Sequence, residues 1–171
     1  MVYDMIRLPN LERLAPNHVP GKGLREKVGG DFAKFMAGRE TCASQLCYAM
    51  NRGGAQIQDM ERYPNPRMIK GGVPRTLKGG DGFLYIFSTI DMVVYLTGRH
   101  GSPSVIPAHK ANEKLDGVEG IVAYGYRHID IWAKWKKYDP YFGPNYYNCS
   151  NDPSAKKWGV FFWPLFRASS P

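Results

Sequence analysis

The apolar residues of this chain follow a helical spacing in the first third and short strand-like runs in the last third. Between residues 41 and 54, four apolar positions recur at the i, i+3, i+4 and i+7 spacing of one helix face: Ala43, Leu46, Cys47 and Met50. Thr41 is a suitable N-cap, and Gly53 with Gly54 supplies a C-terminal stop. The pattern predicts a helix that starts at Cys42 and buries Cys47.

Weaker patterns lie on both sides of this helix. Residues before 30 are rich in Pro, Asn and Gly and are expected to form a lead-in segment with a short helix or turn, followed by a helix from Asp31 to Gly38. Residues 51–80 are broken by Gly and Pro and predict an irregular connection. The apolar run that follows is ambiguous between strand and buried helix, and we favour a helix from Ser88 through Leu96, ended by Gly98.

Strand patterns dominate the last third of the chain. Gly120–Tyr124 and His128–Trp132 predict a β-hairpin that turns at Gly125. Residues 158–163 are apolar enough to form a central strand. Helices therefore precede antiparallel strands, which is typical of an α+β fold with N-terminal helices packed on an antiparallel sheet. A length of 171 residues favours a single domain over residues 1–171.

The net charge of +8 predicts attraction to polyanions such as nucleic acid or an anionic cell envelope. The Lys and Arg residues are scattered, which favours a solvated basic surface. The N-terminus has no basic region followed by an apolar stretch, so no Sec-type signal peptide is expected. The longest apolar run, residues 82–96, is too short to span a bilayer and contains Asp91, so membrane insertion is not expected.

Three cysteines are too few for a disulfide scaffold, and they lack the spacing of a zinc site. No metal or other cofactor is therefore expected, and a disulfide of Cys149 is left open. Cys42 differs from the other two because the start of a helix offers free N–H groups and the positive end of the dipole, which favour the thiolate. Cys42 is our candidate nucleophile.

A thiolate nucleophile needs a general base, for which the chain offers four histidines. His18, His100 and His109 stand in Pro or Gly contexts and are expected to be solvated loop residues. His128 begins a strand in which it shares a face with Asp130. His128 is therefore the candidate base.

A third group should hold the imidazole in the useful tautomer. Asp130 and Asp139 are the two candidates, the latter eleven residues after His128. Side chains two residues apart on a strand lie about 7 Å apart, so Asp130 would have to lean back. Asp139 would reach the ring from a neighbouring strand. We favour Asp139 and keep Asp130 as the alternative.

Several of these segments together resemble a known family. Thr41-Cys42-Ala43 followed by residues 49–54, and residues 120–122 followed by His128–Trp132, are similar to motifs of the type VI secretion amidase effectors of the fourth family. These effectors belong to the NlpC-like branch of papain-like peptidases. Tyr126-Arg127 stand where the family tends to have Gly, so the approach to the imidazole is expected to differ.

The resemblance implies a papain-like fold and an antibacterial toxin, a hydrolase that cuts the bond between γ-D-glutamate and meso-diaminopimelate in peptidoglycan stem peptides. It implies Cys42 as nucleophile, His128 as base and Asp139 as orienting acid. It also implies a cognate immunity protein, synthesis in the cytoplasm without a signal peptide, export by the type VI apparatus, and action in the periplasm of the target bacterium.

Two rival interpretations remain. A basic nucleic-acid-binding domain would account for the charge and for residues 132–138, where aromatic residues alternate with Lys. The basic residues form no recognisable module, so no nucleic-acid partner is expected. The second rival keeps the fold but changes the substrate: a cysteine peptidase or transferase that acts on protein.

Overall fold

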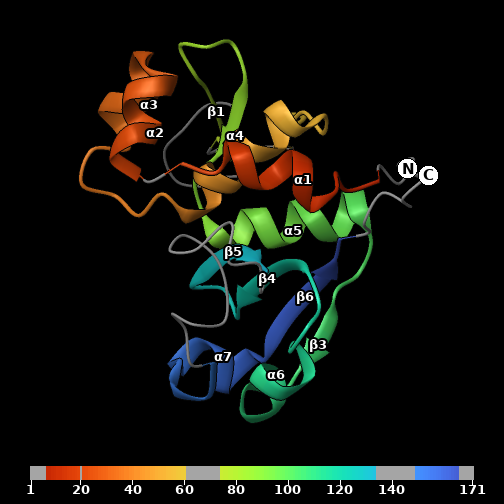
Figure 1. Cartoon of the computed structure of the whole chain (residues 1–171). Coiled ribbons are helices and arrows are strands. Elements are labelled where there is room, and N and C mark those ends of the chain that lie inside the picture. The colour runs from red at the N-terminus through yellow and green to blue at the C-terminus, as the bar shows by residue number, and fades with distance from the viewer. Residues whose placement is uncertain (1–6, 20, 61–73, 134–148, 166–171) are drawn as a thin grey trace, which may run out of the picture.

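The structure is a computed structural model that describes residues 7–19, 21–60, 74–133 and 149–165 (Figure 1). Helix α4 lies at the centre of the N-terminal part and is almost entirely buried. The helices α1, α2, η1 and α5 pack against it. Their bounds are Leu11–Leu14 for α1, Ala15–Asn17 for the 3-10 helix η1, Gly21–Val28 for α2, Gly30–Phe35 for α3, Cys42–Gly53 for α4 and Thr89–His100 for α5.

The strands form a two-stranded antiparallel ribbon and a four-stranded antiparallel sheet. The ribbon pairs β1 (Thr76–Lys78) with β2 (Leu84–Ile86), and β2 packs on α4. The larger sheet has the order β3-β6-β4-β5. Its strands are β3 (Ser104–Ile106), β6 (Val160–Pro164), β4 (Gly120–Tyr124) and β5 (His128–Trp132).

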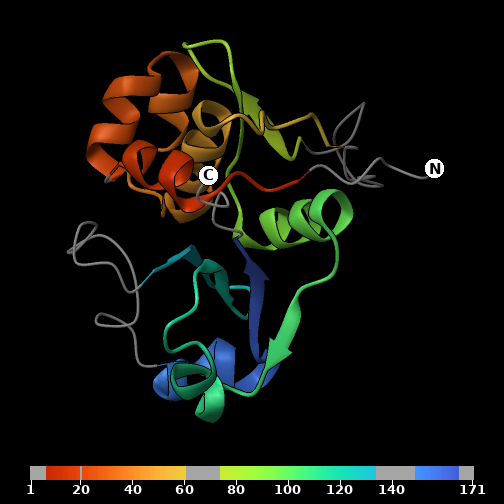
Figure 2. The same ribbon diagram turned by 45° about the vertical axis from the view of Figure 1, so that its right-hand side comes forward.

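Successive side chains of the sheet point to opposite faces, so the interior has two cores. Ile129 and Ile131 of β5 join the core formed with the helices α1 to α5, whereas Trp132 joins the core on the other face. Helices α6 (Ala108–Lys114) and α7 (Pro153–Trp158) and the 3-10 helix η3 (Cys149–Asn151) border this second core. Figures 1 and 2 show α6 and α7 on the opposite side of the molecule from α1 to α4.

The hairpin of β4 and β5 places the first residue of β5 at the turn. Tyr124 pairs with His128, and Gly120 pairs with Trp132. The turn requires glycine at position 125, because its φ of 55° is positive and a Cβ there would collide with Ser154. The turn thus fixes where the His128 side chain starts.

The predictions for α4, β4 and β5 are confirmed in position, and β6 is an interior strand as expected. The predicted strand over residues 158–163 starts too early, because Trp158 ends helix α7 and Gly159 separates it from β6. Helix α5 continues past the predicted end at Gly98 and ends at His100, because one interior glycine destabilises a helix by only about 1 kcal/mol. Helix α3 starts at Gly30, so Asp31 lies in its first turn and is not the cap.

Six elements of the described residues were not predicted: α2, β1, β3, α6, η3 and α7. They are short, and they are held by tertiary burial of a few residues, such as Leu24 and Val28 of α2. Strand β1 (Thr76–Lys78) also corrects the prediction that residues 51–80 form only an irregular connection, because pairing with β2 orders it. No helix in the described ranges is long and apolar enough to cross a membrane.

Candidate active site

The first turn of α4 presents the Cys42 thiol. Thr41 precedes the helix, but its hydroxyl does not cap the helix as the sequence predicted, because it accepts a hydrogen bond from Gln45 Nε2 at 3.1 Å. The Thr41 side chain therefore leaves the N–H groups of the first turn uncapped. Such groups and the positive end of the helix dipole favour an anion at this position.

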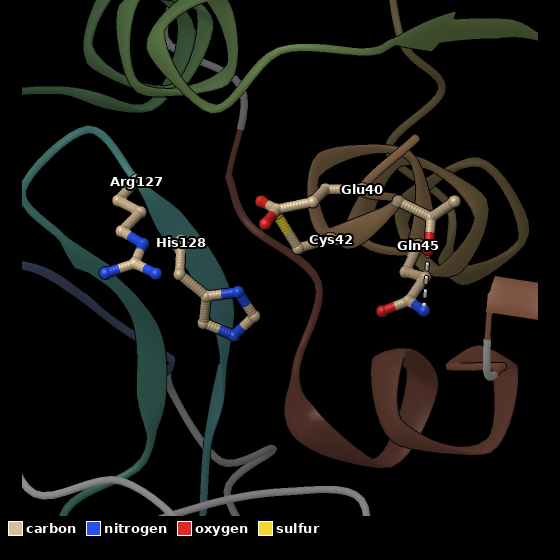
Figure 3. A pocket seen from close by; sticks show the side chains of 6 residues that line it. Glu40, Cys42, Gln45, Arg127 and His128 are labelled. Carbon is tan, nitrogen blue, oxygen red and sulfur yellow. Dashed lines mark hydrogen bonds between the residues drawn. The ribbon is translucent and has the colours of Figure 1, made fainter. Parts of the chain in front are cut away.

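Cys42 opens into a cavity of about 440 Å³. The lining residues come from two walls, and Figure 3 shows Cys42 and Glu40 on the helix wall opposite Arg127 and His128 on the wall that carries β5. The side chains of Cys42 and His128 point toward the same gap. The structure therefore brings together the two residues predicted as nucleophile and base.

Cys42 and His128 change each other's protonation. Burial of Cys42 alone would raise its pKa, but hydrogen bonds from His128 and Thr89 and the positive charge of His128 outweigh burial, so the pKa of the thiol is lowered. Burial of His128 would lower its pKa, but hydrogen bonds with Asp130 and Cys42 raise it to about 10. The two shifts, in opposite directions, correspond to a thiolate–imidazolium pair.

Asp130 lies behind the imidazole ring. Its Oδ2 is 3.5 Å from His128 Nε2, which leaves Nδ1 of His128 for the thiol. Its Oδ1 is 3.3 Å from His18 Nε2. Burial would raise the pKa of Asp130, but the hydrogen bonds with His128 and His18 lower it. Asp130 therefore leans far enough along the strand to contact the base, which the sequence-based geometry disfavoured.

The predicted orienting acid, Asp139, lies outside the described residues, and its role stays a prediction. Asp130 is thus the carboxylate that the described structure places at the ring.

The interpretation of His18 as a solvated loop residue is wrong. Its side chain is only 7% exposed and faces Asp130. The residue follows η1, and the neighbouring α1 packs on α4, which carries this segment to the site. His100 and His109 are also not in loops, since they lie in α5 and α6, and neither lines the cavity. Only tertiary packing distinguishes His18 from the other two, so no local pattern could have identified it.

Thr89 is the second residue that sequence reasoning missed. It is the first residue of α5, and its Oγ1 lies 3.4 Å from Cys42 Sγ. The Arg127 carbonyl oxygen, 3.3 Å from the same hydroxyl, is the alternative acceptor of its proton. The start of α5 therefore meets the start of α4 at the sulfur.

The other cysteines provide internal controls. All three are buried and free, and burial raises the pKa of Cys47 to about 12 and that of Cys149 to about 11. Cys47 is fully buried, which confirms its prediction as a core residue.

We expect iodoacetamide to alkylate Cys42 selectively in the folded protein. Its lowered pKa means that thiolate is present below pH 9, whereas Cys47 and Cys149 stay neutral there. Peptide mass spectrometry at increasing pH would locate the label, with a denatured sample as the control in which all three react. Labelling of Cys47 or Cys149 before Cys42 in the folded protein would contradict this assignment of the reactive thiol.

Comparison with known proteins gives no match to any protein-family model and none to curated proteins by sequence. Solved structures do match. Type VI effector Tae4 from Enterobacter cloacae has a TM-score of 0.65 at 19% identity, covering 95% of this chain and 99% of that one. Tae4 from Salmonella typhimurium, in complex with the immunity protein Tai4 from Enterobacter cloacae, has a TM-score of 0.62 at 19% identity, covering 92% and 99%.

A further match is the Tae4–Tai4 effector–immunity complex from Enterobacter cloacae, with a TM-score of 0.65 at 17% identity over 92% of this chain and 99% of that one. The chain therefore has the fold of the Tae4 type VI effectors over more than nine tenths of its length. This likeness confirms the expected α+β fold class, with N-terminal helices on an antiparallel sheet, and the expected structural resemblance to type VI amidase effectors.

Proposed function

We propose that this protein is a cysteine amidase delivered by type VI secretion, which hydrolyses the γ-D-glutamyl–meso-diaminopimelate bond of peptidoglycan. The observation that carries the proposal is the Cys42 thiol at the start of α4 facing His128 at the start of β5. A lowered thiol pKa and a raised imidazole pKa are what a cysteine nucleophile with its acid–base partner needs.

The reaction is acyl transfer in two steps. The Cys42 thiolate attacks the γ-carbonyl carbon, and the His128 imidazolium gives its Nδ1 proton to the departing amine as the C–N bond breaks. Water then attacks the thioester and gives one proton to His128, the C–S bond breaks, and the product leaves as a carboxylic acid that loses its proton to solvent, so the thiolate and the imidazolium are restored. We assign the backbone N–H of Cys42, at the start of α4, as one donor to the oxyanion.

A carboxylate completes the catalytic group. We retain Asp139 as the orienting acid, on the resemblance and on its spacing from His128. The contact between Asp130 and His128 Nε2 supports Asp130 as the alternative. Either carboxylate would keep the proton on Nε2 and leave Nδ1 facing the thiol.

The charges of the two cavity walls suit this substrate class. Glu40 lies on the helix wall, and Arg127 lies on the opposite wall. In the stem peptide, the D-glutamate residue carries a free α-carboxylate, and diaminopimelate carries an ammonium group. Arg127 therefore complements the carboxylate on one side of the scissile amide, and Glu40 complements the ammonium group on the other side. The resembled family tends to have Gly at the position of Arg127 and so lacks this charged side chain.

The partners and location follow from the same proposal. Two of the similar Tae4 structures contain Tai4 immunity proteins. We propose a cognate immunity protein for this chain, transport by the type VI apparatus, and action on the cell wall in the periplasm of a competitor. The positive net charge supports association with an anionic envelope.

The test is digestion of purified muropeptides and whole sacculi by the full chain, with products separated by liquid chromatography and identified by mass. We expect fragments that end at D-glutamate together with peptides that begin at diaminopimelate. An unchanged muropeptide profile would exclude the cell-wall amidase. Cleavage of casein instead would favour the protein-directed peptidase, and salt-sensitive binding of nucleic acid with an inert Cys42 would favour the nucleic-acid-binding domain.

A further inference from the structure

Thr89 lies at the meeting point of three elements that build the site. Its hydroxyl oxygen is 3.4 Å from Cys42 Sγ on α4 and 3.3 Å from the carbonyl oxygen of Arg127, which precedes β5. The residue is only 8% exposed. Neither the amidase mechanism nor the sequence patterns require a hydroxyl here.

The backbone at Thr89 is held by the start of α5. Ser88 caps this helix by accepting a hydrogen bond from the Asp91 N–H at 3.1 Å, and Arg75 holds the Asp91 carboxylate at 2.8 Å. Thr89 is β-branched, so its χ1 angle is restricted. The hydroxyl oxygen therefore has few alternative positions, whereas the O–H bond rotates freely.

A hydroxyl has one proton and two acceptor lone pairs, so it adapts to both states of the sulfur. When Cys42 is a thiol, its S–H donates to Thr89 Oγ1, and Thr89 donates to the Arg127 carbonyl oxygen. When Cys42 is a thiolate, the Thr89 O–H rotates and donates to the sulfur. No proton leaves Thr89, because the thiol proton passes to His128.

In the described part of the chain, four other charged or titratable side chains lie around the sulfur. His128 faces it from β5, Glu40 and Arg127 lie on the two cavity walls, and Cys47 lies further along α4. Cys47 is neutral at physiological pH because burial raises its pKa to about 12. Among the described residues, the side chains that hydrogen-bond to Cys42 are those of His128 and Thr89.

We propose that Thr89 is a catalytic residue of this site, whose hydroxyl donates to the Cys42 sulfur whenever that sulfur is anionic. It stabilises the nucleophile before attack and stabilises the same thiolate as the leaving group of the second step. The role in turnover rests on the function proposed above. The role in stabilising the thiolate does not, since it concerns the free protein.

Two variants test this role without any substrate. Thr89→Val keeps the shape and removes the hydroxyl, and Thr89→Ser restores a hydroxyl. The measurement is the rate of Cys42 alkylation by iodoacetamide as a function of pH, followed by peptide mass spectrometry. One hydrogen bond to an anion predicts that Thr89→Val reacts about tenfold more slowly below the wild-type midpoint, with the midpoint moved to higher pH. Thr89→Ser should react at close to the wild-type rate.

Controls separate this effect from damage to the fold. Cys47 and Cys149 are buried, so their alkylation would reveal unfolding of a variant. If Thr89→Val exposes them, Thr89→Ala is compared with Thr89→Ser in the same assay. A folded variant without the hydroxyl that matches the wild-type alkylation profile would overturn the proposal, and so would slow alkylation of Thr89→Ser equal to that of Thr89→Val.

Turnover provides a second and separable readout. On muropeptides, Thr89→Val should lower kcat by about tenfold while KM changes little, because the lost hydrogen bond acts on the sulfur and not on substrate binding. A wild-type protein that leaves muropeptides intact would remove the proposed function. The alkylation profiles would still decide whether Thr89 stabilises the thiolate.

Discussion

Replacement of Cys42 by alanine should abolish amide hydrolysis, with a loss of at least about four orders of magnitude in kcat on muropeptides. Without the thiolate no thioester forms, and water would have to attack the amide directly. The side chain lies at a cavity and is small, so the thermal unfolding midpoint should stay near that of the wild type. The measurement is product formation over hours at high enzyme concentration, with circular dichroism to verify folding.

Cys47→Ala is the matched control for this experiment. Cys47 lies in the same helix, but its sulfur accepts a hydrogen bond from the Ile86 N–H at 3.3 Å and contacts Met92. Loss of this buried group should destabilise the fold by roughly 1–2 kcal/mol and leave kcat nearly unchanged at a temperature where the variant is folded. Retained activity in Cys42→Ala with lost activity in Cys47→Ala would refute the assignment of the nucleophile.

The substitution Asp139→Asn should lower kcat by two or more orders of magnitude, because an amide carries no negative charge to stabilise the His128 imidazolium. Asp130→Asn should lower kcat less, by about tenfold, since the remaining carboxylate would still orient the ring. Parallel kinetics of the two variants on one muropeptide would show which carboxylate the reaction needs.

The reverse order of effects would transfer the orienting role to Asp130. Its contact with His128 Nε2 at 3.5 Å makes that outcome physically reasonable. A lower kcat of Asp130→Asn would not show a catalytic role if the variant is also less well folded, because Asp130 contacts the buried His18 as well. The unfolding midpoint of each variant therefore has to accompany its kcat.

The sequence was most informative where local physics decides structure. Helix α4 has a clear apolar period and a glycine stop, and β4 and β5 have β-branched residues on both sides of a glycine turn. Cys42 and His128 begin two of these elements, so their positions could be predicted before their proximity was known. The hairpin turn then sets His128 at the edge where α4 begins.

The remaining parts of the site depend on contacts between distant segments. Thr89 lies 47 residues from Cys42, and its role depends on where α5 starts in space. His18 follows a short 3-10 helix whose neighbour α1 rests on α4. Threonine at a helix start and histidine near proline are common patterns, so neither could have been distinguished without tertiary structure.

The two walls of the candidate active site come from opposite halves of the chain. Cys42 and Thr89 precede residues 116–118, which are exposed between α6 and β4, and His128 follows them. A cut at these residues would give two inert fragments, which the pairing of β3 with β6 could dock together again. Hydrolysis would then be detected only when the two fragments associate. Fused to two interacting proteins, the fragments would report that interaction as amidase activity.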